Sequence, residues 1–238
     1  MISIGIDVAE AVKGLDLVAI NQARDVVQSH GHLTPEAVVQ LVGELRPAVV
    51  CIDSPPGWSA GGRSRGAERA LAAVGISSFA TGTDPGDHPF SAWMRVGAPL
   101  FAGLADRYPR YRGGDVAGTA AEVFPHATAL LLAGRLRAVA ERKLWYRRNV
   151  LRESGVTDEL PTLDRVDAAL GALTGLLAME GRHGWVGDPD EGVILLPTQL
   201  TVARFARARR TDVGHASPRP VAGFRFRRDG VRSTRDRV

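Results

Sequence analysis

The sequence is poor in the residues that mark several common classes of protein. Its single cysteine, Cys51, excludes an internal disulfide, and the apolar segment PAVVCID around it predicts a buried core residue. No apolar run approaches the roughly 20 residues of a membrane span. The N-terminus lacks the basic and then apolar regions of an export signal. We therefore expect a cytoplasmic protein with no part in a membrane.

Lysine is almost absent as well, because 28 of the 30 basic residues are arginine. Residues 199–238 carry eleven arginines and three aspartates, a net charge of +8, which leaves −4 on residues 1–198 since the whole chain carries +4. A basic arm suits a polyanion, and Phe224 and Phe226 among the arginines suit base stacking. A solvated tail without a partner is the alternative. We divide the chain into a domain over 1–198 and a basic tail over 199–238.

Hydrophobic periodicity in the first 198 residues predicts alternating strands and helices. Strands are expected over residues 2–7, 15–20, about 25–28, 47–53, 120–125 and 192–197. Helices are expected over residues 35–45, 68–75, 90–108, 126–134, 143–154 and 163–180, with a break near Pro99. Three antiparallel strands followed by alternating helices and parallel strands indicate a mixed α/β sheet layered by helices.

Carboxylates end or interrupt several of these apolar elements. Asp7 and Asp53 each end a buried strand, and if the two strands are parallel neighbours their ends lie about 4.8 Å apart. Glu122 lies within a later strand, and Asp164 and Asp167 lie three residues apart on one face of the last helix. Buried carboxylates are costly unless they are paired or bind a metal. Together they predict a site for divalent cations.

Each acidic residue also has a purely structural interpretation. Asp53 suits a cap of the following SPPG turn, Asp164 suits the start of its helix, and Glu122 suits a pair with an arginine. The segment GDPDEG (187–192) is rich in acids, but it lacks the alternating ligand register of a calcium-binding EF-hand. Its proline and glycines indicate a tight turn.

Basic residues near these acids are candidates for binding phosphate. Arg63, Arg65 and Arg69 follow the strand that Asp53 ends, although solvated arginines are the alternative. His126 lies four residues after Glu122. It is a candidate either to orient water or phosphate or to cap a helix. Lys143 is one of only two lysines, and it is expected either to reach the site or to lie on the surface.

Seven segments in the right order resemble a family of predicted RNase H-like nucleases of bacteria and archaea, formally a domain of unknown function. They are GIDVAEAVKG (5–14), IDSPPG (52–57), the stretch from GGR to ER (61–69), WMRVG (93–97), EVFPHA (122–127), LDRVDAALGALTG (163–175) and the stretch from VGDPDEG to LLP (186–197). The late helix is also similar to that of the Holliday-junction resolvases in the same superfamily. The resemblance spans roughly residues 1–198 and implies an RNase H-like fold, with a mixed five-stranded sheet of three antiparallel and then two parallel strands.

The resemblance implies a nuclease that hydrolyses phosphodiester bonds with two Mg²⁺ or Mn²⁺ ions. Asp7 would bridge the ions, Asp53, Glu122 and Asp167 would complete their ligands, and Asp164 would be accessory. Nucleic acid would contact Arg63, Arg69, His126 and Lys143. Two alternatives remain: a catalytically degenerate nucleic-acid-binding or regulatory protein, and an actin-like-fold phosphotransferase, which the lack of an internal repeat and of a P-loop disfavours.

Overall fold

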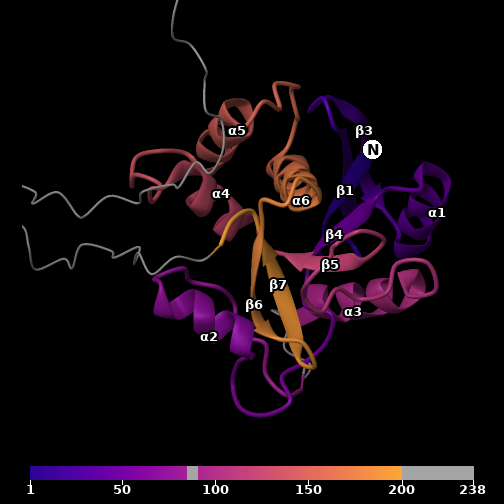
Figure 1. The fold of residues 1–238 in the computed structure, drawn as a ribbon, viewed down its shortest axis with the longest axis vertical. Coiled ribbons are helices and arrows are strands. Elements are labelled where there is room, and N and C mark those ends of the chain that lie inside the picture. The colour runs from indigo at the N-terminus through magenta and orange to yellow at the C-terminus, as the bar shows by residue number, and fades with distance from the viewer. Residues whose placement is uncertain (85–90, 200–238) are drawn as a thin grey trace, which may run out of the picture. The chain divides into compact units, whose positions relative to one another are not determined.

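The computed structural model describes residues 1–84 and 91–199, so the expected basic tail lies, apart from Gln199, outside the described residues. The described residues form one seven-stranded mixed sheet (Figure 1). Its strands are β1 (Ile2–Asp7), β2 (Leu15–Asn21), β3 (Val26–Leu33), β4 (Val49–Asp53), β5 (Ala120–Val123), β6 (Gly184–Asp188) and β7 (Gly192–Leu196). The strand order is β3-β2-β1-β4-β5-β7-β6.

The expected mixed α/β sheet is confirmed, but the expected number of five strands is wrong. β1, β2 and β3 form an antiparallel meander, and β4 and β5 add to it in parallel, as expected. Beyond them β7 pairs in parallel with β5, and β6 pairs antiparallel with β7. Residues 189–191, in the middle of the segment from Gly187 to Gly192, form the turn of this last hairpin, so the interpretation as a tight turn is confirmed.

Six helices accompany the sheet, and none of them, within the ranges that the structure describes, is long and apolar enough to cross a membrane. They are α1 (Pro35–Leu45), α2 (Gly66–Ala73), α3 (Ala92–Leu104), α4 (Pro125–Ala133), α5 (Lys143–Glu153) and α6 (Leu163–Met179). Local signals explain where several begin. The Thr34 hydroxyl accepts a hydrogen bond from the Ala37 amide at the start of α1, and Thr162 does the same for Arg165 in α6. Thr162, rather than Asp164, is therefore the cap of α6.

The expected break near Pro99 is wrong, because α3 runs through this residue. A proline inside a helix removes one backbone hydrogen bond and favours a kink. Leu100, Phe101 and Leu104, which follow Pro99, are all buried in the core. Tertiary packing of an apolar face contributes most of the stability of a protein helix, and here it holds α3 together.

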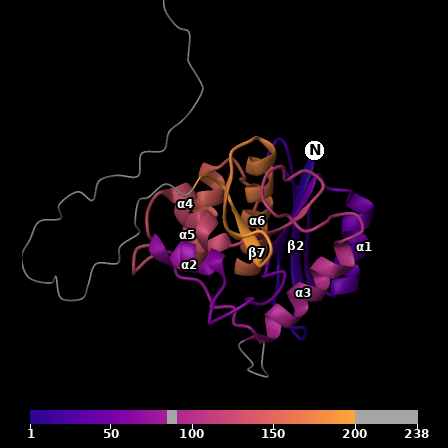
Figure 2. The same cartoon turned by 60° about the horizontal axis from the view of Figure 1, so that its bottom comes forward.

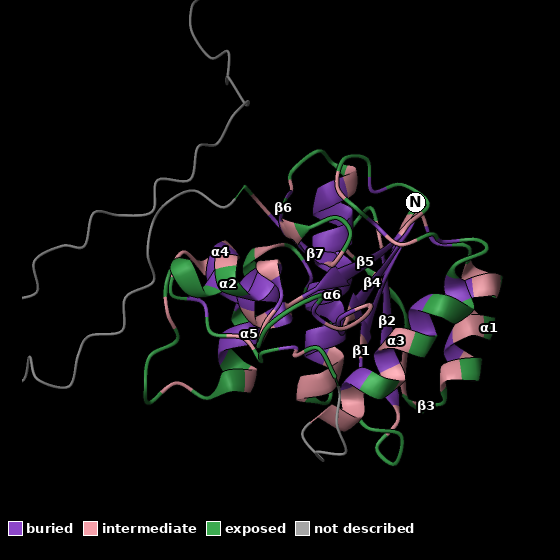
Figure 3. Ribbon diagram, turned by 90° about the horizontal axis from the view of Figure 1, so that it is seen from below, coloured by how far each residue is buried: buried purple, intermediate pink, exposed green. Residues whose placement is uncertain are grey.

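The two faces of the sheet are covered by different helices (Figure 2). α1 and α3 pack against each other and enclose a core that includes Ile4, Ile6 and Ile52. α6 covers the opposite face of β1, β2 and β4, and α4 and α5 pack beside it. Figure 3 shows α6 buried along most of its length. Because side chains alternate along a strand, neighbouring residues of β1 and β4 point to different layers.

α6 approaches the sheet closely enough for backbone contact. A Cβ atom added to Gly5 of β1 would lie 1.9 Å from the carbonyl oxygen of Ala168 in α6. One added to Gly175 of α6 would lie 2.3 Å from the Ser3 hydroxyl. No larger residue fits at either position without a shift of the helix. These glycines therefore fix the distance between α6 and the strands that carry Asp7 and Asp53.

Candidate metal centre

Two strand ends bring Asp7 and Asp53 together. β1 and β4 are parallel neighbours, and Asp7 is the direct register partner of Asp53. Gly5, two residues before Asp7, contacts α6, so strand alternation points Asp7 and its partner Asp53 toward the α6 layer. The carboxyl ends of parallel strands are where open α/β sheets build their sites.

The third carboxylate, Asp167, comes from the second turn of α6 and is buried. Its Oδ2 atom forms an ion pair with the guanidinium of Arg147 in α5, and the Lys143 ammonium lies 3.8 Å from the same oxygen. Its Oδ1 atom is buried and has no hydrogen-bond partner among the described residues. Arg147 thus holds Oδ2 of Asp167 in place, while Oδ1 receives no hydrogen bond from the described residues.

The charges of Asp7, Asp53 and Asp167, which we call the aspartate cluster, disfavour one another. Burial, followed by the charges of Asp167 and Asp164, raises the pKa of Asp7 from 3.8 to about 8. Burial, and then the charges of Asp7 and Asp167, raises the pKa of Asp53 well above its ordinary range. Burial raises the pKa of Asp167 too, although Arg147 and Lys143 oppose the shift. The cluster therefore lacks enough positive charge to neutralise it.

The donor atoms of this cluster are of the kind that a divalent cation prefers. Carboxylate oxygens are the preferred ligands of Mg²⁺, and the unpartnered Oδ1 of Asp167 is a free ligand atom. Over residues 1–84 and 91–199, however, no three acidic, histidine or cysteine side chains are already arranged as the ligands of a metal ion. The aspartate cluster is consequently an acidic pocket rather than a closed coordination shell.

Glu122 is close enough to Asp53 for its charge to help raise the pKa of Asp53, but its carboxylate is engaged elsewhere. It is the register partner of Ile52, whose side chain packs in the α1–α3 layer, so Glu122 points to the face of the sheet opposite to Asp53. Both of its carboxylate oxygens accept hydrogen bonds from the buried Arg65, at 2.7 and 2.6 Å. The same guanidinium donates to Glu68 at 3.0 Å. Three of the four carboxylates expected to bind metal therefore lie together, whereas the fourth, Glu122, is paired with Arg65.

We call Arg65, Glu68 and Glu122 the arginine clamp. Burial alone would lower the pKa of Arg65, but the two carboxylates outweigh it and raise that pKa. Burial raises the pKa of Glu122, and Arg65 partly opposes this. Glu68 also accepts from the backbone amides of Arg65 and Thr81, at 3.1 and 2.8 Å. The clamp therefore connects β5, α2 and the following loop.

One cavity of about 400 Å³ joins these groups. The aspartate cluster, Asp164, His126 and Lys143 all line it, and so do Glu122 and Arg65 of the arginine clamp. Asp164 is partly exposed, and the Lys13 ammonium lies 2.7 Å from its Oδ2. Asp164 thus faces the cavity as one half of an ion pair.

The family model for "Protein of unknown function (DUF429)" matches residues 5–191. The chain belongs to this family. The family resemblance drawn from the seven sequence segments is therefore confirmed. No curated protein matches the chain. Among solved structures the chain is similar to RuvC from Thermus thermophilus, with 15% identity, a TM-score of 0.41, and coverage of 76% of this chain and 97% of RuvC.

The residues of this DUF429 protein that were expected to bind phosphate lie partly on the cavity and partly on the surface. Arg63 and Arg69 are exposed and do not line the cavity, and Arg69 donates to the Ser64 carbonyl. Arg65, the third arginine of that segment, is committed to the clamp. His126 is the second residue of α4 and packs edge-on against the ring of Phe124, with 5.6 Å between the ring centroids.

Sequence reasoning did not identify Arg147, although a signal was present. Arg147 follows Lys143 by four residues, so the two basic side chains lie on one face of α5. That face contacts the aspartate cluster through Asp167. No comparable signal predicts Glu122 as a partner of Arg65, because the two lie 57 residues apart in the sequence.

Proposed function

We propose that this DUF429 protein is a metal-dependent nuclease of RNase H-like fold that hydrolyses phosphodiester bonds. The observation that carries the proposal is the aspartate cluster, three carboxylates from β1, β4 and α6 on one cavity with too little positive charge to balance them. The order of the first five strands, β3-β2-β1-β4-β5, supports the fold assignment. Burying such charges is costly unless a cation is bound, and this argues for a ligand rather than a structural role.

Asp7, Asp53 and Asp167 would hold Mg²⁺ or Mn²⁺, with Asp164 next to them. Bound there, divalent ions would activate a water molecule and stabilise the leaving oxygen of the phosphodiester. We leave Glu122 out of the ligand set because Arg65 occupies both of its oxygens. The site would therefore use three acidic ligands where the sequence suggested four.

Basic side chains of α5 would position both the cluster and the substrate. Arg147 opposes the effect of burial on the pKa of Asp167 and fixes Oδ2, and this would direct Oδ1 to its role as a ligand. Lys143 is half exposed on the cavity wall and would donate to a non-bridging oxygen of the scissile phosphate. His126, on the same cavity, would orient water or phosphate.

The charge around α5 supports a nucleic acid as the substrate. Residues 134–153 hold seven basic and two acidic residues: Arg135, Arg137, Arg142, Lys143, Arg147, Arg148, Arg152, Glu141 and Glu153. Trp145 is exposed in the middle of this segment, and the Arg148 guanidinium lies over its ring at 5.6 Å. Cationic side chains interleaved with an exposed aromatic ring favour nucleic acid over a small phosphodiester.

Cleavage assays on single-stranded and duplex DNA and RNA, with Mg²⁺ or Mn²⁺, test the proposal. Asp7→Asn, Asp53→Asn and Asp167→Asn should each lower the rate at least about 100-fold, since Asn keeps the shape but removes the ligand charge. Asp190→Asn is the matched control, because Asp190 is exposed on the β6–β7 turn and pairs only with the exposed Arg112 among the described residues. Activity that survives both EDTA and Asp7→Asn would contradict the proposal.

The arginine clamp favours one second candidate function. A Glu122 that is neutralised by Arg65 is consistent with a degenerate site that binds nucleic acid and does not cut it. Filter binding across the same substrates separates the two functions. Salt-dependent binding without cleavage in any divalent metal would support the binding protein.

A further inference from the structure

The acidic cavity continues into a second hollow, of about 310 Å³, that the proposed chemistry does not use. Val8, Lys13, Phe79 and Trp93 line both spaces, so the two are contiguous. Val8 follows Asp7 directly. The hollow therefore begins one residue from the aspartate cluster.

Two aromatic rings form a wall of this hollow. The ring centroids of Phe79 and Trp93 are 6.3 Å apart, and the ring planes are tilted by 59°. Phe79 is 54% exposed, and Trp93, in the first turn of α3, is half-buried. Burying an aromatic ring is strongly favourable, so a phenylalanine that is left this exposed beside a charged pocket suggests a binding surface.

A cation lies beside the rings. The Lys13 side chain is half exposed and reaches Asp164 at 2.7 Å, on the boundary between the hollow and the acidic cavity. From there it can contact a phosphate next to a group held on the rings. The aromatic rings, a neighbouring cation and the aspartate cluster match, in that order, a base, its flanking phosphate and the scissile phosphodiester.

We propose that the hollow of Phe79 and Trp93 binds an unstacked nucleobase next to the scissile phosphate, so that the substrate is single-stranded nucleic acid. This inference rests on the proposed function and names its substrate class. Bases inside a duplex are stacked and paired, and they reach a side pocket only after extrusion. Bases of a single strand stack on protein aromatic rings without that cost and with little dependence on sequence.

Comparing substrates with and without bases tests the inference. The substrates are a thymidine or uridine homopolymer and an abasic strand of the same length and charge, with the sugar that the protein cleaves. Wild type should cleave the homopolymer with a kcat/KM about tenfold higher than that of the abasic strand. Phe79→Ala should lose about tenfold on the homopolymer and show little difference between the two substrates.

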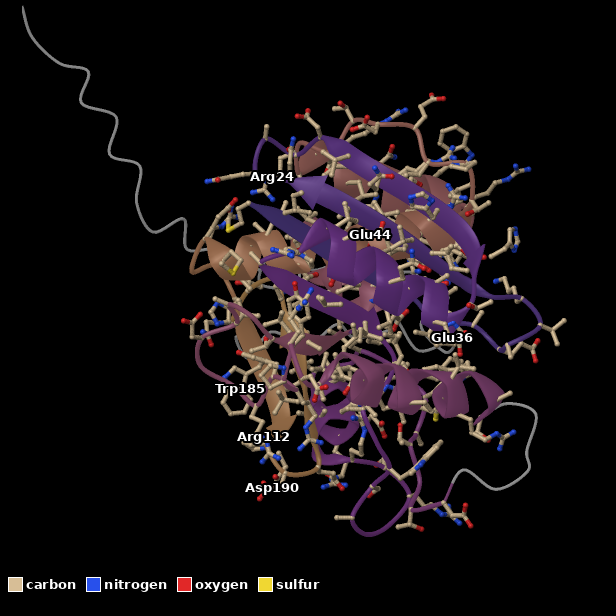
Figure 4. All side chains as sticks on the ribbon, turned by 90° about the vertical axis from the view of Figure 1, so that its right-hand side faces the viewer. Arg24, Glu36, Glu44, Arg112, Trp185 and Asp190 are labelled. Atoms are coloured by element: carbon tan, nitrogen blue, oxygen red, sulfur yellow. The ribbon has the colours of Figure 1, made fainter. Side chains whose placement is uncertain are left out.

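Trp185→Ala is the matched control. Trp185 is also an exposed aromatic residue, at 41%, but it lies on β6 near Arg112 and Asp190 and lines neither space (Figure 4). It should retain the wild-type preference for the homopolymer. If Phe79→Ala keeps the full difference between the substrates, or if wild type prefers duplex, the inference is wrong, and a protein segment becomes the occupant to test.

A binding measurement keeps this inference separate from the proposed chemistry. A single strand containing 2-aminopurine should lose fluorescence on binding to Asp7→Asn, since stacking quenches this base, and it should keep its fluorescence with Asp7→Asn/Phe79→Ala. Quenching without cleavage by wild type in any metal would leave the base site standing and overturn the nuclease. Cleavage that depends on Asp7 but not on Phe79 would overturn the base site alone.

Discussion

The two faces of the sheet carry two groups of buried or half-buried carboxylates whose charges are balanced in opposite ways. Glu68 and Glu122 surround a buried guanidinium that donates to both. Asp7 and Asp53, on the other face, form no salt bridge among the residues that the structure describes, and Asp167 keeps one oxygen unpartnered. The arginine clamp is electrically complete, whereas the aspartate cluster is not.

We propose that this difference separates structural acids from functional ones. A buried carboxylate is tolerated when its charge is matched within the protein, and the clamp meets this condition. The aspartate cluster leaves its charge unmatched at the expense of stability, and such unfavourable sites persist where a ligand completes them. Carboxylates thus stabilise the fold on one face and, we propose, carry the chemistry on the other.

The largest expected effect comes from breaking the clamp. Arg65→Met should lower the free energy of unfolding by about 3–5 kcal/mol, because it leaves two buried carboxylates without their cation. Urea denaturation at neutral pH measures the loss. Arg69→Met is the control, since Arg69 is exposed on the same helix, and it should change stability by less than about 0.5 kcal/mol.

A rescue variant identifies the cause of that loss. Adding Glu122→Gln to Arg65→Met should recover part of the stability, because Gln removes one of the stranded charges. A loss below about 1 kcal/mol for Arg65→Met would show that water or other groups satisfy the carboxylates, and the contrast between the two faces would disappear.

Neutralising Asp7 should raise the free energy of unfolding, whereas Arg65→Met should lower it. In the folded protein its pKa is about 8, against an ordinary value of 3.8, so the folded state binds this proton more tightly than the unfolded chain does. By linkage, the stabilising contribution of this proton is complete below pH 3.8 and is lost as the pH rises through 8. Asn does not ionise, so Asp7→Asn should avoid this loss.

At pH 9 with EDTA present, we expect Asp7→Asn to be more stable than wild type by about 2 kcal/mol, less than the full shift implies because solvent screens part of it. Thermal unfolding of both proteins from pH 5 to 9 measures the difference. Parallel stability profiles would show that neither burial nor the neighbouring acids raise the pKa of Asp7. A variant that is inactive and yet more stable would be the signature of a functional acid.

The smallest expected effect is stabilisation by metal. At a free Mn²⁺ concentration tenfold above the Kd, wild type should gain about 1.4 kcal/mol, seen as a rise in Tm of several degrees. Asp7→Asn should lose this gain. Glu122→Gln should keep it, since Arg65 already occupies Glu122. An equal loss of the Mn²⁺ response in both variants would return Glu122 to the ligand set.

Much of the fold was predictable because its signals are local. Thr34 and Pro35 mark the start of α1, and alternating or continuous apolar runs mark β1, β2 and β4. β6 was missed because its sequence, GWVGD, holds two glycines in five residues, and its strand conformation comes from pairing with β7 rather than from propensity. β6 is one of the two strands beyond the expected five. The other, β7, was expected as a strand but was not counted in the sheet.

The site was predictable where geometry follows from strand order. Asp7 and Asp53 are brought together because each ends an apolar strand and the strands are parallel neighbours. The direction of Glu122 was not predictable, because the four-residue strand AAEV is buried on both sides and its apolar pattern marks neither face. Its pairing with Arg65 depends on a long-range contact that no local pattern encodes.

The backbone contact between Gly5 and α6 limits which substitutions proteins of this family can accept. The spacing between the first strand and the helix of Asp167 is set by main-chain atoms, so substitutions of large core side chains cannot tune it. Gly5→Ala would push the helix away from the strand and move Asp167 relative to Asp7. The α1–α3 side of the sheet is free to exchange one apolar residue for another while the acids keep their places. New specificity would then arise at the rim, in Phe79, Trp93 and the α5 surface, where a substitution alters what is bound and leaves the distances between the ligands intact.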